Sequence, residues 1–509
     1  MALALVVVAL FSILLGSIWL YIQYSYSYWK RRGIPYIEPS FPFGTFKKTL
    51  LQKSLLAEEL KEMYQKTTEP FIGMYSLLRP SILIRDPALI RDILIKDFSS
   101  FHNRGWHVNM DVDPMANNML VQSNEKWRHS RTKLSPAFTS GKLKGMFETI
   151  VKCGDSLEEF IIKEANSGKS VEVREMFARF ATNVIASVGF GIEIDCLKEP
   201  DNEFRKYGRK FFDSNVTNGL RSIAFFLTPV LGKLFRSRFA DKDVGDFMIE
   251  AVKQTLEYRE KNNITRKDFI QLLMQVRNGE KIQDNTDWTT KTGKSEKFMS
   301  LEEMAAQAHL FFIGGFESNS TTMSFCLYEL ARNPDIQNKA YEDIATVLES
   351  YNGELTYDAV AEMKYMEKCI EETLRMHAPF GFFSRECTKD YKIANSNAVI
   401  EKGTYVMFSA SGIHYDPKYF ENPNEFIPER FDGNKTFLEM PFLAFGEGQR
   451  NCIAARLGKL QAKIGVILML KKFKFELGDE HKNRELEIDP ISPAKAPKNG
   501  VNLKVILRQ

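Results

Sequence analysis

FGEGQRNCIA, residues 445–454, is the stretch of sequence that says most about the fold. Gly446 and Gly448 tolerate positive φ angles and so allow a tight turn. From residue 453 to residue 473 apolar residues recur at helical spacing, which predicts a helix that starts just after Cys452. Backbone N–H groups and the helix dipole at such a start stabilise a thiolate and lower the pKa of the thiol. The stretch therefore predicts that Cys452 is a thiolate ligand.

The sequence contains six cysteines, and the other five lack this setting. None belongs to a CxxC pair, so a zinc cluster is not expected, and their low density disfavours a disulfide scaffold. A cysteine is by default a small buried hydrophobic residue. On its own, Cys452 would be read the same way, but the phenylalanine, glycines and arginine at fixed offsets favour the ligand. We expect the default for Cys153, Cys196, Cys326, Cys369 and Cys387.

The loop resembles the cysteine loop of the cytochrome P450 family, whose pattern is F-x-x-G-x-R-x-C-x-[GA]. Phe445, Gly448, Arg450, Cys452 and Ala454 match this pattern. The resemblance implies a mainly α fold with minor β structure and a single large catalytic domain. It also implies haem b (iron protoporphyrin IX), with Cys452 as the axial ligand and Phe445 and Gly448 against the cofactor. Donation from a thiolate to haem iron favours cleavage of the O–O bond.

A second motif, Glu372-Thr-Leu-Arg375, matches the E-x-x-R of the family. The i, i+3 spacing places the two side chains on one helical face, where they can pair. Most such pairs are solvated, so the motif alone says little. Arg375 lies 77 residues before Cys452 (452 − 375). The family's P-E-R-F element, residues 428–431, lies between them. The resemblance implies that Arg430 joins Glu372 and Arg375 in a buried charge network.

Trp127 and Arg131 match the W-x-x-x-R of the family. The i, i+4 spacing puts two donors on one helical face, which suits an anionic haem propionate. The resemblance gives the same role to Arg450 and, from their place in the chain, to Arg104 and Arg385.

Residues 313–319, IGGFESN, stand where the family has its oxygen-binding helix. Two mid-helix glycines cost about 1 kcal/mol each relative to alanine, and close approach of the haem at Gly315 is a reason for them. Glu317 and Ser318 supply an acid and an alcohol for proton delivery. The sequence departs from the family because Ser318 replaces threonine and Asn319 replaces threonine or serine. A serine hydroxyl has more rotamers than a threonine hydroxyl, so we expect more oxygen to leave as hydrogen peroxide.

The N-terminal residues 2–22 carry no charge and are long enough to cross a bilayer as a helix. The first charges, Lys30 to Arg32, follow this segment, which predicts that the rest of the chain faces the cytosol. A cleaved signal peptide is the alternative, although its apolar stretch would be shorter. We expect an anchor at 1–29, a Pro- and Gly-rich hinge at 30–45 and a catalytic domain at 46–509. The expected interface aromatics are Trp19, Tyr21, Tyr24, Tyr26, Tyr28 and Trp29.

Length alone, 509 residues, suggests two to four domains, whereas the resemblance implies one. Helical periodicity dominates from about residue 50 to residue 380, and residues 278–297 read as an exposed polar loop. A second apolar stretch, Ile223–Leu231, contains Pro229 and is either buried or dips into the bilayer. The expected helices are 58–64, 146–165, 247–262 and 300–332; β structure is expected at 71–85, 391–408 and 500–507, with an irregular connection at 416–430.

The resemblance places the substrate pocket at 106–120, 309–316, 380–383 and 491–494. Its expected aromatic lining is Phe312, Phe316, Phe380, Phe382 and Phe383, although each has core packing as the alternative. His309 reads as a polar pocket or core residue, and neither His377 nor His414 needs a metal. A flanking basic group is either a solvated surface or a docking site for an acidic reductase: Lys126, Arg128, Lys133, Lys142, Lys144 and Lys459.

The net charge of +4 is too small to suggest nucleic-acid binding. Three further segments, at residues 127–142, 189–204 and 384–393, are similar to insect microsomal members of family 6. This resemblance implies a monooxygenase of the endoplasmic reticulum membrane that oxidises small lipophilic compounds, often plant toxins and insecticides. NADPH-cytochrome reductase, a flavoprotein, would supply electrons, with cytochrome b5 as a second possible partner. The alternatives are oxidation of an endogenous hormone or lipid, a haem-thiolate isomerase and a non-enzymatic haem-binding protein.

Overall fold

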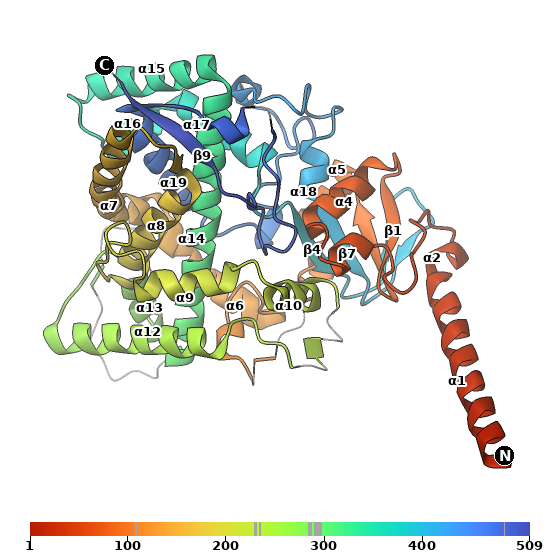
Figure 1. The fold of residues 1–509 in the computed structure, drawn as a ribbon. Helices are drawn as coiled ribbons and strands as arrows, with labels where there is room; N and C mark the ends of the chain where they lie inside the picture. The colour runs from red at the N-terminus through yellow and green to blue at the C-terminus, as the bar shows by residue number, and fades with distance from the viewer. Residues whose placement is uncertain are drawn as a thin grey trace.

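Helix α14 (Leu301–Arg332) runs through the middle of the molecule in this computed structural model (Figure 1). Its start is fixed by a capping box, in which Ser300 and Glu303 exchange side-chain and backbone hydrogen bonds. It ends before Pro334, which begins the next helix, α15 (Pro334–Ser350). α14 packs against α8 (Val173–Ile185), α12 (Lys242–Asn262), α17 (Lys364–Met376) and α19 (Ala455–Leu470).

The structure describes residues 1–509 except 107–108, 111, 229–231, 234–235, 283–287, 290–297, 483 and 509. The other helices lie before and after α14 in the chain. They are α3 (Lys47–Leu50), α4 (Leu56–Gln65), α5 (Pro87–Arg91), α6 (Asn124–Leu134), α7 (Ser140–Ser167), α9 (Glu203–Phe212), α10 (Val216–Phe226), α13 (Phe269–Arg277), α16 (Tyr357–Glu362) and α18 (Ala410–His414). Single turns of 3₁₀ or π helix are η1 (Asp92–Lys96), η2 (Phe98–Ser100), η3 (Pro114–Ala116), η4 (Ser135–Phe138), η5 (Ala186–Phe190), η6 (Pro428–Phe431), η7 (Gly448–Arg450) and η8 (Asp479–His481).

In the described residues the β structure forms three small sheets. The largest has the order β1-β2-β7-β4, in which only the β2–β7 pair is parallel. It packs against α4 and α18, to one side of the helical body (Figure 1). The strands are β1 (Phe71–Ser76), β2 (Arg79–Ile84), β3 (Val171–Glu172), β4 (Phe382–Glu386), β5 (Tyr391–Lys392), β6 (Val399–Ile400), β7 (Tyr405–Ser409), β8 (Phe473–Leu477) and β9 (Asn502–Leu507).

The expected elements are found with shifted ends. The helix expected at 146–165 is α7 and is longer at both ends, while the helix after the cysteine loop begins at Ala455 and ends at Leu470. Residues 416–430 are irregular, as expected, apart from the turn η6. The loop expected at 278–297 lies largely outside the described residues.

Helix α1 (Ala2–Tyr26) projects from the body as a separate rod (Figure 1). Its span Leu3–Tyr26 has a mean hydropathy of 2.7 and is long and apolar enough to cross a membrane. The short helix α2 (Tyr28–Arg31) follows and already belongs to the body. The apolar length thus agrees with the expected anchor.

Trp29 corrects one sequence expectation, because it is not an interface residue. Its side chain is 0% exposed, and its indole Nε1–H donates to the carbonyl oxygen of Met74 at 2.9 Å. Gly73 makes the room, since a Cβ there would lie 2.5 Å from the Trp29 ring. Residues 35–45 are also hydrogen-bonded to β1, so the expected hinge is attached to the sheet.

Candidate functional site

A cavity of about 400 Å³ lies where the cysteine loop, α14 and the first sheet converge. The loop contributes Phe445, Arg450 and Cys452, and α14 contributes Gly314 and Ser318. Protein surrounds Cys452, and the accessible surface of its side chain faces this cavity. The residues expected from distant parts of the sequence therefore meet around one space.

The cysteine loop has the predicted turn geometry. Gly446 and Gly448 adopt φ angles of +70° and +74°, in the left-handed region that glycine favours. A Cβ on Gly448 would lie 2.1 Å from the carbonyl oxygen of Leu94, so a larger residue does not fit. The Cys452 N–H donates to the carbonyl oxygen of Phe445 at 2.9 Å, which closes the loop.

The expected lowering of the Cys452 pKa is wrong for the thiol in these surroundings. Burial raises the pKa, and this effect exceeds the opposing effects of the Ala454 N–H, Arg131 and Arg104. All three groups favour the thiolate, and of these the sequence suggested only the backbone N–H. A coordinating metal deprotonates a thiol outright, so a raised pKa of the free thiol is compatible with a ligand.

The other cysteines follow the expected default. Cys196, Cys326, Cys369 and Cys387 are buried, and Cys153 is half-buried. Burial raises the pKa of all five thiols. They are inert core residues, since the thiolate is the reactive form.

Four arginines converge beside Cys452: Arg104, Arg131, Arg385 and Arg450. Among the described residues none of them pairs with a carboxylate, and they donate to carbonyl or amide oxygens. The Nε of Arg104, the Nε of Arg385 and the Nη1 of Arg450 are buried without a partner in that part of the chain.

Burial lowers the pKa of all four guanidinium groups. Repulsion by neighbouring arginines adds to this at Arg104, Arg385 and Arg450, and the pKa falls to about 7 at Arg450 and about 10 at Arg104. The Arg450 guanidinium lies 4.1 Å from the ring centre of Trp127, which lines the same cavity. Buried cations with unused N–H groups require an anionic group between them. The two propionates of haem b have the charge that this cluster lacks, so the residues fit the cofactor.

Gly314 and Gly315 of α14 are required as glycines for different reasons. A Cβ on Gly314 would meet no atom within 4 Å, so this glycine opens the helix surface to the cavity. A Cβ on Gly315 would lie 2.3 Å from Cδ1 of Ile185 on α8, so helix packing excludes a larger residue there. Gly315 also lines the cavity, but the reason expected from the sequence applies to Gly314 more directly.

Glu317 and Ser318 do not form a direct pair in this structure. The Glu317 carboxylate is 3% exposed and pairs with Arg174 on α8, away from the cavity lining. The Ser318 hydroxyl faces the cavity and donates to the carbonyl oxygen of Gly314. Consecutive residues of a helix point about 100° apart, which accounts for the separation. Asn319 likewise donates to the carbonyl oxygen of Gly315, at 3.0 Å.

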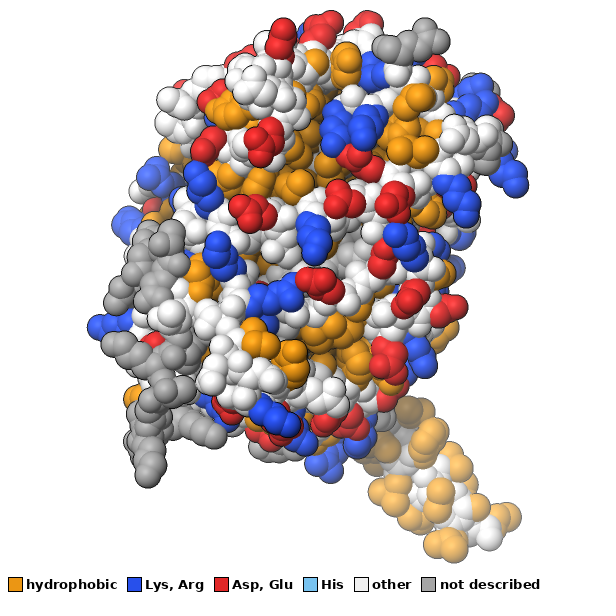
Figure 2. All heavy atoms as spheres, turned by 90° about the vertical axis from the view of Figure 1, so that its left-hand side faces the viewer, with side chains coloured by type: hydrophobic (Ala, Val, Ile, Leu, Met, Phe, Trp, Pro, Cys, Tyr) orange, Lys and Arg blue, Asp and Glu red, His pale blue; other side chains and the backbone are white. Residues whose placement is uncertain are grey.

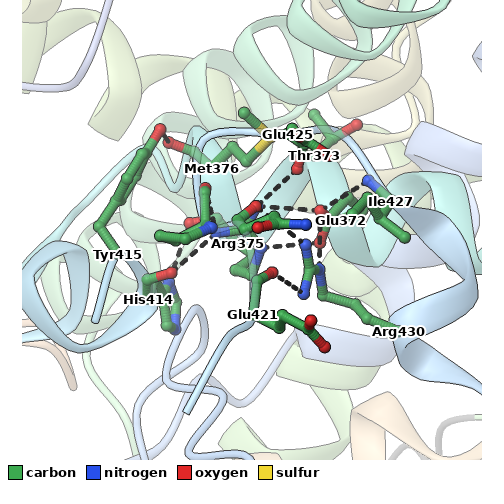
Figure 3. A network of polar contacts seen from close by, with 12 residues as sticks. Glu372, Thr373, Arg375, Met376, His414, Tyr415, Glu421, Glu425, Ile427 and Arg430 are labelled. Atoms are coloured by element: carbon green, nitrogen blue, oxygen red, sulfur yellow. Dashed lines mark hydrogen bonds and ion pairs between the residues drawn. The ribbon is translucent and has the colours of Figure 1, made fainter. Parts of the chain in front are cut away.

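The E-x-x-R pair lies in a buried network, as the resemblance implied (Figure 3). Arg375 donates to Glu372 from Nε at 2.7 Å and from Nη2 at 2.9 Å. Arg430 and the Ile427 N–H each donate to Glu372 at 2.9 Å. Arg375 also donates to the carbonyl oxygen of His414 at 2.7 Å, which ties α17 to α18.

His414 extends this network to the cysteine loop, and sequence analysis missed its role. Its Nε2 accepts from the Leu443 N–H at 2.8 Å, so Nδ1 carries the proton and donates to the carbonyl oxygen of Arg375 at 3.0 Å. Leu443 in turn accepts from the Gly446 N–H at 2.9 Å. Burial lowers the pKa of His414 to about 3, which keeps the imidazole neutral.

The remaining cavity lining is mostly apolar and includes many phenylalanines, but the aromatic members differ from those expected. Phe380, Phe382 and Phe383 line it as expected, whereas Phe312 and Phe316 belong to the core and pack against other rings. His309 is buried in contact with two phenylalanines and does not line the cavity. The aromatic residues that sequence analysis missed are Phe138, Phe211, Phe212, Phe225, Phe226, Phe239, Phe269 and Phe311.

The described part of the apolar segment 223–231 is buried or half-buried in the protein. Phe225 and Phe226 line the cavity and Leu227 is buried, which favours the buried alternative. Residues 229–231 lie outside the described residues. A smaller cavity of about 60 Å³ shares Phe226 and Pro493 with the main one and is lined by residues 490–495, which include the expected C-terminal turn.

The basic group expected near the haem is mixed with acids. Lys144 pairs with Asp358 at 3.1 Å and Lys459 with Glu371 at 3.0 Å. The face that includes α7 and α12 likewise shows basic and acidic side chains intermixed (Figure 2). Lys142 is fully buried, with its ammonium 4.5 Å from the ring centre of Trp288, and so is not a surface residue.

Comparisons with known proteins agree with the geometry. The family model described as "Cytochrome P450" matches residues 39–501. "Probable cytochrome P450 6d5" of Drosophila melanogaster is 39% identical over 497 residues, 97% of each chain. "Cytochrome P450 6d3" of Musca domestica is 36% identical over 504 residues, 96% of each chain. "Cytochrome P450 6k1" of Blattella germanica is 37% identical over 470 residues, 91% of this chain and 89% of its own.

Proposed function

Because the chain belongs to the cytochrome P450 family of haem-dependent monooxygenases, we propose that it detoxifies lipophilic foreign compounds on a membrane. Plant toxins and insecticides are the proposed substrates. The supporting observation is the large, mostly apolar and phenylalanine-rich cavity that contains Cys452. Oxidation of an endogenous hormone or lipid is the alternative that the same cavity would allow.

Cys452 is proposed to hold the haem iron. The propionates would be bound by Arg104, Arg131, Arg385 and Arg450, together with Trp127. The unused N–H groups of three of these arginines carry this assignment, because buried donors without partners are costly. Phe445, Gly448 and Gly315 are proposed to contact the cofactor.

The haem, when bound, supplies activation of dioxygen, so that one oxygen atom can enter the substrate. The chain's own residues would exclude water, orient the substrate and move protons. Ser318 is proposed to hold a proton at its Oγ, which already faces the cavity. Glu317 is proposed to replace that proton, for which its carboxylate must leave Arg174 and turn toward Ser318.

Electrons are proposed to come from NADPH through a flavoprotein reductase, with cytochrome b5 as a second donor. Lys126, Arg128, Lys144 and Lys459 are proposed to contact the reductase. Each has an acidic partner within 3.0–3.9 Å, which a carboxylate of the reductase would replace. Such contacts are screened by salt, so turnover should fall as ionic strength rises.

Residues 1–26 are proposed to anchor the protein in the endoplasmic reticulum membrane, because Trp29 of the expected segment 1–29 is buried in the body. Residues 46–509 are proposed as the catalytic domain in the cytosol. The length and hydropathy of α1 support the anchor. The basic residues Lys30, Arg31 and Arg32 directly after it support the cytosolic orientation. Residues 30–45 would set the tilt of the domain through their bonds to β1.

The test is turnover of the full-length protein with NADPH-cytochrome reductase in microsomal membranes. The panel holds furanocoumarins, pyrethroids, neonicotinoids and hormone precursors. We expect product that depends on both NADPH and reductase, with foreign compounds preferred. Turnover of hormone precursors alone would contradict the detoxification proposal. Product without NADPH would indicate an isomerase, and haem binding without any product would indicate a haem-binding protein.

Cys452→Ser tests the iron ligand. We expect it to lose the thiolate-type spectrum with carbon monoxide, whereas Cys387→Ser, at a buried cysteine outside the cavity lining, should keep it. A Cys452→Ser protein that retained this spectrum would refute the assignment.

A further inference from the structure

Arg221 lines the cavity beside several phenylalanines, and its side chain is 19% exposed. It lies on α10, one turn before Phe225 and Phe226, and all three line the cavity. It lies on a different element from the arginines beside Cys452, and its partners are Asn218 and Asp241. A charged side chain in a mostly apolar lining is normally paired, so the partners of Arg221 matter.

Asn218 orients the Arg221 guanidinium through a hydrogen bond. The Asn218 amide is buried, and its Nδ2 donates to the carbonyl oxygens of Lys210 at 2.9 Å and Asp213 at 2.8 Å. Since both N–H groups are used, its Oδ1 is turned toward Arg221 and accepts from Nη1 at 3.1 Å. The orientation of Arg221 is therefore set by the C-terminal end of α9.

Asp241 balances the charge of Arg221. Its carboxylate, at the N-cap of α12, accepts from Nη2 and forms an ion pair. Among the described residues these two bonds use two of the five N–H groups of the arginine. The others are left as donors on a group whose net charge is already offset.

We propose that Arg221 selects substrates that carry a neutral hydrogen-bond acceptor, such as the carbonyl oxygen of a lactone or ester, on an aromatic body. This inference rests on the proposed function and makes its substrate class more specific. A neutral oxygen can accept a bond from the remaining N–H groups. A carboxylate would gain less, because Asp241 already balances the positive charge and would repel a second anion.

The test compares 7-ethoxycoumarin with 2-ethoxynaphthalene, which share a two-ring body and an ethyl ether but differ in the lactone carbonyl. Binding to the full-length protein in lipid nanodiscs is measured by equilibrium dialysis. Loss of one hydrogen bond corresponds to about a tenfold change in affinity. We expect Arg221→Met to weaken binding of the coumarin about tenfold and to leave the naphthalene nearly unchanged.

Arg209→Met is the matched control. Arg209 lies on α9, pairs with Asp213 at 3.9 Å and does not line the cavity, so this variant should bind both compounds as the wild type does. Asp241→Asn provides a second measurement. It retains the guanidinium but removes the balancing charge, and should therefore raise the affinity for 7-ethoxycoumarin-3-carboxylate.

If Arg221→Met weakened the binding of both neutral compounds equally, Arg221 would serve only to connect α10 with α12. That result would overturn the inference. A wild type that binds neither compound would also overturn it. Discrimination in dialysis without any NADPH-dependent product would leave this inference standing and contradict the proposed monooxygenase activity. The two ideas therefore fail in different measurements.

Discussion

His414→Phe is predicted to destabilise the protein, because His414 is the link between the charge network and the cysteine loop. The ring is fully buried and stacks on Phe442, with centroids 5.4 Å apart and planes inclined by 15°. Phenylalanine keeps a planar ring for this contact. It removes the acceptor of the Leu443 N–H and the donor to the Arg375 carbonyl.

The magnitude follows from these two hydrogen bonds. Leaving a buried polar group without a partner costs about 1–3 kcal/mol, and a donor and an acceptor are both affected. A loss of about 2–4 kcal/mol in the free energy of unfolding is expected. The entropy of unfolding of a chain this long is about 1 kcal/mol per degree, so the midpoint of thermal unfolding should fall by about 2–4 °C.

His309→Phe is the matched control, since His309 is also fully buried but both of its ring nitrogens lack a partner in the described part of the chain. The ring is enlarged equally in both variants, so the difference between them isolates the hydrogen bonds. Thermal unfolding of the full-length proteins, followed by tryptophan fluorescence, should give a lower midpoint for His414→Phe and an unchanged or higher one for His309→Phe. Equal midpoints would refute the role assigned to His414.

Three further predictions concern pH, oxygen use and helix packing. Burial lowers the pKa of His414 to about 3 and of His309 to about 4, so only the unfolded chain takes up these protons as the pH falls below about 6.5. Each histidine should therefore lower the free energy of unfolding by about 1.4 kcal/mol for each pH unit of acidification. Each histidine-to-phenylalanine variant should reduce the slope of the thermal midpoint against pH. Ser318→Thr should lower the hydrogen peroxide released per NADPH consumed, because the β-methyl group restricts the hydroxyl; an unchanged ratio speaks against this. Gly315→Ala should lower the thermal midpoint, since the new Cβ meets Cδ1 of Ile185 at 2.3 Å. Adding Ile185→Val, which lacks that atom, should restore part of the loss. No recovery in the double variant would show that packing is not the cause.

The sequence predicted the family, the mainly α fold and the convergence of distant motifs, and the family match confirms the first two. These predictions succeeded because they rest on local rules. Helical periodicity marks α14, and paired glycines mark the turn before Cys452. Such signals are contained within a few turns of chain.

What the sequence did not predict depends on contacts between distant segments. The partner of Glu317 is Arg174, which is 143 residues away, and nothing near Glu317 in the chain indicates it. Phe312 and Phe316 were placed in the cavity because helical spacing gives a face but not the neighbour that covers it. Their neighbours include Phe190 and Phe212, from other elements.

Trp29 sets the point at which the chain can be shortened for soluble production. A truncated protein that begins at Ser27 removes α1 and keeps the indole against Gly73. One that begins at Gly33, after the last of the three basic residues, would leave a hole the size of a tryptophan beside β1 and free the carbonyl oxygen of Met74. The boundary of the expression clone therefore follows from one buried ring and not from the end of the hydrophobic segment.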